Sequence, residues 1–232
     1  PRDAVAITNA DIIFINGAGL EENLMPLIES AEGLGKLIEV SRGIDIIFSV
    51  GKDGKTQNPD PHTWMNPLNI LSWLNNITEV LVEIDPVHEN EYLVNSSYYA
   101  LKIEDLDFWV HSQVDVIPDN RRIIVSDHNV LGYFNAAYGF TQLGTITGSS
   151  STEASPTAQD IANLEEVIKQ YDVPAIFISE MSSLTLADQI ALDTGLKVVM
   201  ILHGSLSLEG GPAPTYLDFM RYNVTAITDA LR

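Results

Sequence analysis

The sequence predicts an α/β protein with two lobes, each built on a parallel sheet, joined by one long helix. In the second half, short continuous apolar runs alternate with helical stretches, as in parallel sheets that are covered by helices. In the first half, an apolar run that ends at Gly17 has the composition of a strand buried on both faces. Between them, a stretch from Pro86 to about Val114 has helical spacing. Proline is tolerated at the first position of a helix, and Pro118 follows the end of this one.

The first half is predicted to alternate between strands and helices. In chain order, the expected elements are the end of a helix at residues 3–10, a strand at Asp11–Asn16, a helix at Glu21–Ala31, strands at Lys36–Val40 and Ile46–Ser49, a loop at Gly51–Pro61 and a helix at Pro67–Ile84.

The second half alternates more regularly. The expected strands are Arg122–Ser126, Thr141–Ile146, Ala175–Ser179 and Lys197–Leu202, and the expected helices are Asn129–Tyr138, Thr157–Gln170, Leu184–Thr194 and Pro214–Leu231. We therefore divide the chain into a first lobe (residues 1–84), a linking helix (85–118) and a second lobe (119–232).

Composition excludes several classes of function. The 232 residues include 12 basic and 32 acidic side chains, for a net charge of -20. Such a surface repels phosphates, so we expect no nucleic-acid partner. The chain has no cysteine, which excludes thiolate metal sites and disulfides. We find no apolar run long enough to span a membrane, and no signal-peptide pattern in these residues. The abrupt start at Pro1 leads us to expect that the natural N-terminus lies upstream.

Metal-ligating side chains follow three of the four predicted strands of the second lobe. These are His128 after Asp127, then Glu180, then His203. Ligands of open parallel sheets bind beyond the carboxyl ends of the strands, so these side chains are expected at one edge. Each alone has a simpler interpretation: His128 as a hydrogen-bonded loop residue, Glu180 as a neighbour of a helix N-cap, where the helix dipole favours it, and His203 as a surface loop residue. Together they predict a metal site.

The first lobe offers His62, between Pro61 and Trp64 and ahead of a helix. A histidine that binds a metal through one ring nitrogen usually donates a hydrogen bond from the N–H of the other to an acceptor, which fixes the ring. Asp60 and Asp127 are near enough in sequence to be these acceptors. His88 and His111 lie on a long acidic helix, and we assign them no role.

Several motifs of the chain match the signature segments of one protein family. Asp60–Pro67 matches a DPH-x-W-x-[DN]-P signature, and Ser126–Phe134 with Ala137–Gly139 matches an SH-x-x-[FL]-G-Y-F…YG segment. Asn9–Asp11, Asn16–Gly17 and Leu20–Glu21 match an ADL…NG-x-x-LE stretch, and Gly211–Asn223 is similar to late segments of some members. With these motifs the chain resembles the zinc- and manganese-specific solute-binding proteins of ABC transporters. The resemblance implies two α/β lobes joined by a rigid helix, with one metal ion bound by four residues.

By that resemblance, His62 and His128 are two of the ligands. The family's early histidine has no counterpart here, and its late aspartate aligns with Gly204 or, by a shift of one residue, with His203. The fourth ligand is therefore Glu180, His203, water or an upstream histidine. Glu180 is favoured over His203 by a narrow margin, because family members carry a similar glutamate.

The predicted function is extracytoplasmic capture of a divalent transition metal for an ABC permease by a monomeric protein that is not an enzyme. Imidazole ligands favour Zn²⁺, and Mn²⁺ is the alternative if carboxylates complete the site. A metal-dependent hydrolase could use the same side chains, but there is no HExxH helix. The missing aspartate also allows a metal-free adhesin or scaffold.

Overall fold

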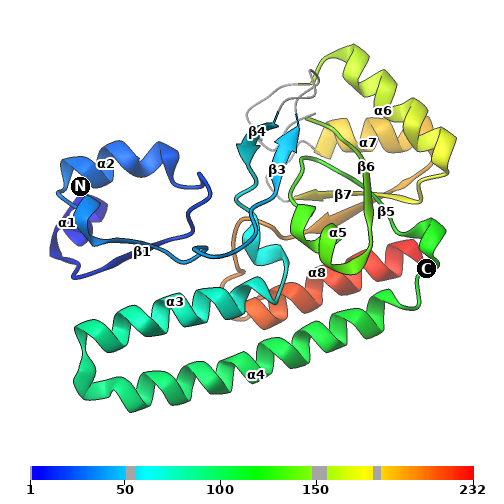
Figure 1. Cartoon of the computed structure of the whole chain (residues 1–232). Coiled ribbons are helices and arrows are strands. Elements are labelled where there is room, and N and C mark those ends of the chain that lie inside the picture. The colour runs from blue at the N-terminus through cyan, green and yellow to red at the C-terminus, as the bar shows by residue number, and fades with distance from the viewer. Residues whose placement is uncertain (1, 51–55, 148–155, 180–183) are drawn as a thin grey trace. The chain divides into compact units, whose positions relative to one another are not determined.

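The computed structural model describes residues 2–50, 56–147, 156–179 and 184–232, which form two compact units (Figure 1). The first unit is Pro1–Glu104 and the second is Asp105–Arg232. Within the described residues, no helix is both long enough and apolar enough to span a membrane.

In its described residues, the first unit contains two pairs of short strands and two longer helices. Its elements are α1 (Arg2–Asn9), β1 (Ile13–Ile15), α2 (Met25–Ser30), β2 (Leu37–Glu39), β3 (Phe48–Val50), β4 (Thr56–Pro59), α3 (Asn69–Ile84) and the first part of α4 (Glu89–Val114). β1 pairs with β2 in parallel, and β3 pairs with β4 in antiparallel. The elements that sequence periodicity predicts here are present, although several are shorter than expected.

Three details of the first unit differ from the prediction. Residues 56–59 form β4 instead of a loop, because backbone pairing with β3 makes a strand of a polar segment that lacks apolar alternation. Phe14 in β1 is 38% exposed, so this strand is not buried on both faces. The helix expected at Glu21–Ala31 is a 3-10 turn followed by α2, whose first turn contains Pro26.

The helix α4 is 26 residues long and agrees with the long helix predicted from Pro86 onwards. A 3-10 turn at Pro86–His88 precedes it. Its buried positions are Ile103, Leu106, Val110 and Val114. Their spacing of three and four residues places them on one face of the helix.

The second unit is built on a four-stranded parallel sheet in the order β6-β5-β7-β8. The strands are β5 (Ile123–Ser126), β6 (Thr141–Thr145), β7 (Ala175–Ser179) and β8 (Lys197–Ile201), and the helices are α5 (Gly132–Tyr138), α6 (Ala158–Tyr171), α7 (Leu184–Thr194) and α8 (Tyr216–Leu231). All of these elements were predicted, within a few residues at their ends.

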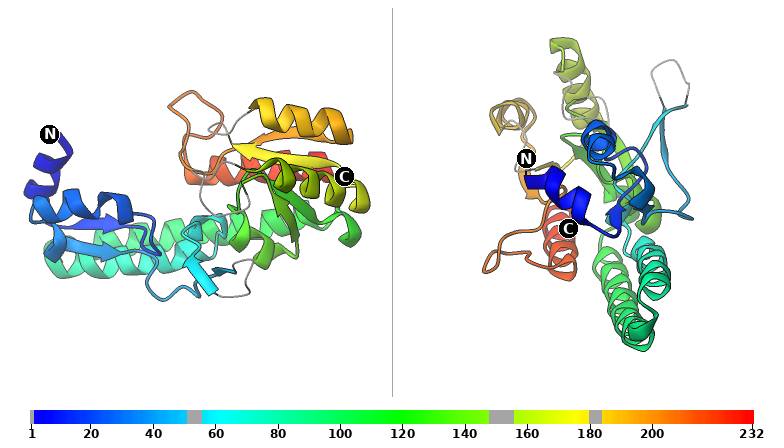
Figure 2. Two further views of the ribbon diagram at one scale, coloured as in Figure 1. Left: turned by 90° about the horizontal axis from the view of Figure 1, so that it is seen from above. Right: turned by 90° about the vertical axis from the view of Figure 1, so that its left-hand side faces the viewer.

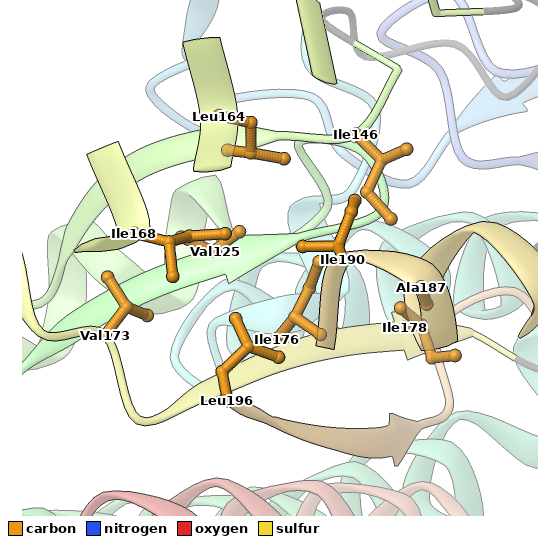
Figure 3. Packing of buried hydrophobic residues seen from close by; sticks show 10 residues of the cluster. All are labelled: Val125, Ile146, Leu164, Ile168, Val173, Ile176, Ile178, Ala187, Ile190 and Leu196. Atoms are coloured by element: carbon orange, nitrogen blue, oxygen red, sulfur yellow. The ribbon is translucent and has the colours of Figure 1, made fainter. Parts of the chain in front are cut away.

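Helices cover both faces of this sheet. Figure 3 shows Leu164 and Ile168 of α6 and Ile190 of α7 against Val125 of β5 and Ile176 of β7. Figure 2 shows α8, in red, on the opposite face, where it contacts β7 and β8. Because β7 is buried at every position, its sequence is continuously apolar instead of alternating.

The strand order places a topological switch point between β5 and β7. From β5 the chain passes through α5 to β6 at the edge of the sheet, and from β6 it returns through α6 to β7 on the other side of β5. The two connections leave in opposite directions, so the carboxyl ends of β5 and β7 flank the place where ligands of such sheets bind. Asp127 and His128 directly follow β5 at this point.

Candidate metal centre

His128 lies in a tight turn at the end of β5, held by the residue before it. The Oδ1 atom of Asp127 accepts hydrogen bonds from the backbone N–H of His128 at 2.7 Å and from its ring Nδ1 at 2.9 Å. A carboxylate only accepts hydrogen bonds, so Nδ1 carries the hydrogen and a metal ion would bind at Nε2. Both side chains are buried, at 2% exposure each.

The same turn is anchored to the next strand of the sheet. The backbone N–H of Asp127 donates to the carbonyl of Phe177 at 3.0 Å, and the N–H of Ser179 donates to Oδ2 of Asp127 at 2.9 Å. The hydroxyl of Ser126 donates to the carbonyl of His128 at 2.7 Å. Asp127 therefore fixes the His128 ring and ties it to β7.

His203 lies beside His128. The centroids of the two imidazole rings are 4.6 Å apart, with the ring planes at 72°. A potential ligand atom of each lies within 4.8 Å of one on the other, a spacing that allows both to reach a single ion. The neighbouring Leu202 is held by Asn223 of α8, whose carboxamide accepts from its N–H at 2.8 Å and donates to its carbonyl at 2.7 Å.

In the first unit, His62 is held by a similar carboxylate arrangement. Asp60 Oδ1 accepts from the backbone N–H of His62 at 3.0 Å and from its ring Nδ1 at 2.7 Å. His62 and Asp60 are both buried, and the ring of Trp64 meets the imidazole edge-on at 5.3 Å. As with His128, a metal ion would bind at Nε2.

The other predicted residues divide into two groups. Glu180 lies outside the described residues. His88 and His111 make contacts elsewhere: Nδ1 of His88, in the 3-10 turn before α4, bonds to Asp85 at 2.7 Å, and the ring of His111 in α4 meets that of Tyr138 in α5 at 4.9 Å. The structure thus brings Asp127, His128 and His203 together in the second unit and pairs Asp60 with His62 in the first.

Sequence reasoning missed the asparagines that fasten the backbone beside these histidines. Asn223 holds Leu202 next to His203, and Asn16 donates to the carbonyl of Pro61 next to His62 at 2.9 Å. Both asparagines are buried. Asn16 belongs to the NG-x-x-LE stretch noted above and Asn223 ends the Gly211–Asn223 segment, so these two motifs were the available signals.

Comparisons with known proteins place the chain in a family. The model of the family described as zinc-uptake complex component A, periplasmic (ZnuA), matches residues 1–230. The manganese-binding lipoprotein MntA of Halalkalibacterium halodurans is 32% identical over 232 residues, covering 100% of this chain and 75% of that protein. The iron ABC transporter substrate-binding lipoprotein MtsA of Streptococcus pyogenes serotype M1 is 29% identical over 238 residues, covering 100% of this chain and 76% of that protein.

A solved structure agrees with these relatives. The Mn-bound periplasmic metal binding protein from Candidatus Liberibacter asiaticus has a TM-score of 0.85 and 30% identity, covering 100% of this chain and 84% of that one. Fold, family and location outside the cytoplasm agree with the expectation from sequence. The chain therefore belongs to the ZnuA family of periplasmic and lipoprotein metal-binding components of ABC importers.

Proposed function

We propose that this protein captures Zn²⁺ outside the cytoplasm and delivers it to an ABC permease, acting as a monomeric binding protein and not as an enzyme. The observation that carries the proposal is the buried Asp127–His128 pair beside His203, at the switch point of a parallel sheet. An imidazole fixed through Nδ1 by a carboxylate is oriented as metal-binding histidines usually are.

In this proposal the ion is held by His62, His128 and His203, with Glu180 supplying a carboxylate. His62 is included because Asp60 orients its ring as Asp127 orients that of His128. The contact between the rings of His128 and His203 supports His203, which the sequence had placed slightly behind Glu180. Asp60 and Asp127 orient ligands and do not themselves bind the ion.

Zinc is favoured over manganese because of the ligand types. Imidazole nitrogen suits Zn²⁺, whereas Mn²⁺ prefers a larger share of carboxylate and water oxygens. Three imidazoles with one carboxylate would make a site richer in nitrogen than manganese prefers. The relatives named for manganese and iron make Mn²⁺ and Fe²⁺ the competing ions to measure against.

The experiment is a thermal unfolding series on metal-stripped protein with added Zn²⁺, Mn²⁺ or Fe²⁺. An ion that binds only the folded state raises the melting temperature by mass action. We expect zinc to produce the largest increase at equal concentration, and His128→Ala to remove most of it. No increase with any of the three ions would contradict the proposal. Turnover of a phosphoester or peptide that requires His128 would indicate a hydrolase instead.

A further inference from the structure

Asn16 is a buried polar residue at the end of β1 that the proposed metal site does not yet include. It is 8% exposed and is followed by Gly17, whose positive φ of 82° favours glycine. The carboxylate of Glu21 accepts from the backbone N–H groups of Asn16 at 2.6 Å and Gly17 at 3.0 Å. The backbone that carries the Asn16 side chain is therefore fixed independently of what this side chain contacts.

The Asn16 carboxamide contacts the residues on both sides of His62. Its Nδ2 donates to the carbonyl of Pro61 at 2.9 Å and to that of Gly17 at 2.7 Å. Its Oδ1 accepts from the hydroxyl of Thr63 at 3.1 Å. Pro61 and Thr63 are 45 and 47 residues away in sequence, so these bonds join β1 to the turn that carries His62.

A second set of contacts ties the same turn to β2 and α3. The hydroxyl of Ser41, just after β2, lies 3.0 Å from that of Thr63 and donates to Asn16 Oδ1 at 3.4 Å. The indole N–H of Trp73 in α3 donates to Ser41 at 3.2 Å. Thr63 is fully buried, so loss of one partner leaves polar atoms that water does not reach.

We infer that Asn16 is a positioning residue for His62, which sets metal affinity by holding the turn on either side of this ligand. The inference rests on the proposed role of His62 in metal binding. Asp60 fixes the imidazole relative to its own turn, and Asn16 fixes that turn relative to β1. Without Asn16 the turn can shift as a unit with its Asp60–His62 bond intact, so Nε2 changes position even though the ring keeps its acceptor.

The test compares Asn16→Ala with Asn76→Ala. Asn76 is a matched control because it is also buried in the first unit and donates to two backbone carbonyls, of Val40 at 2.8 Å and Arg42 at 2.9 Å. It does not touch the His62 turn through any of these bonds. Zinc affinity is measured by competition with a chromophoric chelator, unfolding by urea, and ligand geometry by the visible absorption bands of Co²⁺ bound in place of zinc.

We expect both variants to be less stable, but only Asn16→Ala to lose zinc affinity, by about tenfold, the lower end of the cost of removing a partner outside the ligand shell. The same variant should shift the Co²⁺ absorption bands, which a uniform loss of stability does not do. Thr63→Val keeps the side-chain shape and removes the hydroxyl that donates to Asn16. It should lower zinc affinity and shift the Co²⁺ absorption bands in the same direction as Asn16→Ala does. It also provides the test if Asn16→Ala does not fold.

The inference would be overturned if Asn16→Ala had the zinc affinity and the Co²⁺ bands of the wild type. If Asn16→Ala does not fold, the same result in Thr63→Val would overturn it. An equal loss of affinity in Asn76→Ala would also overturn it, because the effect would then follow stability alone. His62→Ala separates the two proposals. If that change lowers zinc affinity and Asn16→Ala does not, only the positioning role fails, whereas unchanged affinity in His62→Ala removes His62 itself from the site.

Discussion

The carboxylate of Asp127 bonds to both the backbone N–H and the ring Nδ1 of the next residue, His128, at 2.7 and 2.9 Å. Asp60 makes the same two bonds to His62, at 3.0 and 2.7 Å, although here one residue lies between them. Two histidines in different units are thus oriented by one local arrangement. A ring held by a buried carboxylate loses little further rotational freedom when it binds a metal ion, which favours affinity.

The first prediction concerns this carboxylate. Asp127→Asn keeps the side-chain shape but removes the negative charge. It also replaces one of the two acceptor oxygens with an NH2 group, which donates hydrogen bonds. We expect zinc affinity to fall by about 10- to 100-fold, the usual cost of losing a partner that orients a ligand. Chelator competition on metal-stripped protein measures this.

Asp85→Asn is the matched control for Asp127→Asn. Asp85 also bonds to a histidine Nδ1, that of His88, at 2.7 Å, but this pair is exposed, at the 3-10 turn that precedes α4. The zinc affinity of the Asp85→Asn variant should equal that of the wild type. If Asp127→Asn also binds zinc as the wild type does, Asp127 does not orient a ligand.

The second prediction concerns metal choice. His203→Asp replaces an imidazole with a carboxylate, the harder ligand, at the position that a shift of one residue aligns with the aspartate of the family resemblance. We expect the ratio of Mn²⁺ to Zn²⁺ affinity to rise, since carboxylate oxygen suits manganese better than imidazole does. Electron paramagnetic resonance of free Mn²⁺ and chelator competition for zinc give the two affinities. An unchanged ratio would show that His203 does not contact the ion.

The third prediction is a pH dependence at the 3-10 turn that precedes α4. A hydrogen bond from Tyr92 and then one from His88 lower the pKa of Asp85, and the bond to Asp85 raises the pKa of His88. Because the carboxyl pKa is lower in the folded state, its contribution to the free energy of unfolding is present above the unfolded pKa of about 4. This contribution is lost as the pH falls through the folded pKa. Because the imidazole pKa is higher in the folded state, its contribution to the free energy of unfolding is present below the unfolded pKa of about 6.5. This contribution is lost as the pH rises through the folded pKa.

The pair therefore contributes most between these limits, near pH 5.5. Urea unfolding in the presence of a chelator should show a larger difference between wild type and His88→Ala at pH 5.5 than at pH 8.5. In an Asp85→Asn background that pH dependence should disappear. A difference of equal size at both pH values would contradict the assignment.

The fourth prediction concerns Tyr138, whose hydroxyl donates to Asp107 of α4 at 2.6 Å. Tyr138→Phe removes a bond to a charged acceptor, so the free energy of unfolding should fall by roughly 1–3 kcal/mol. Urea unfolding at pH 7 measures it. A change close to zero would mean that water replaces the hydroxyl at Asp107.

Tyr138 also carries a pH signature. Burial, and then the bond to Asp107, raise the pKa of its phenol well above the usual range. The contribution of a raised pKa is fully present below the unfolded value of about 10 and is lost progressively above it. Wild-type stability should therefore fall more steeply above pH 10 than that of Tyr138→Phe, and parallel curves would contradict this.

Sequence predicted the second unit well because its strands and helices have strong, distinct apolar patterns. β7 is apolar throughout, and α6 begins at a capping box in which the Thr157 hydroxyl accepts from the N–H of Asp160 at 3.2 Å. Such local signals are complete within a few residues. The strand-end rule then places His128 and His203 correctly at one edge of the sheet.

The first unit was harder to predict because long-range pairing decides its short elements. β4 is polar and exists through its pairing with β3, and β1 leaves Phe14 partly exposed beside a single partner strand among the described residues. The bonds of Asn16 to Pro61 and Thr63 join segments more than 40 residues apart. One sequence holds no local signal for which distant segments such bonds join, so the contacts of the asparagines beside the candidate ligands appear only in the structure.

The most direct measurement is a calorimetric zinc titration of metal-stripped wild type, His62→Ala, His128→Ala and the double variant. The account predicts one zinc ion per wild-type chain and a loss of at least about 100-fold in each single variant, since removing a ligand costs more than removing its orienting partner. The double variant should lose less than the sum of the single losses, because both histidines serve one ion. Wild-type affinity in both single variants would contradict the assignment of His62 and His128 as metal ligands.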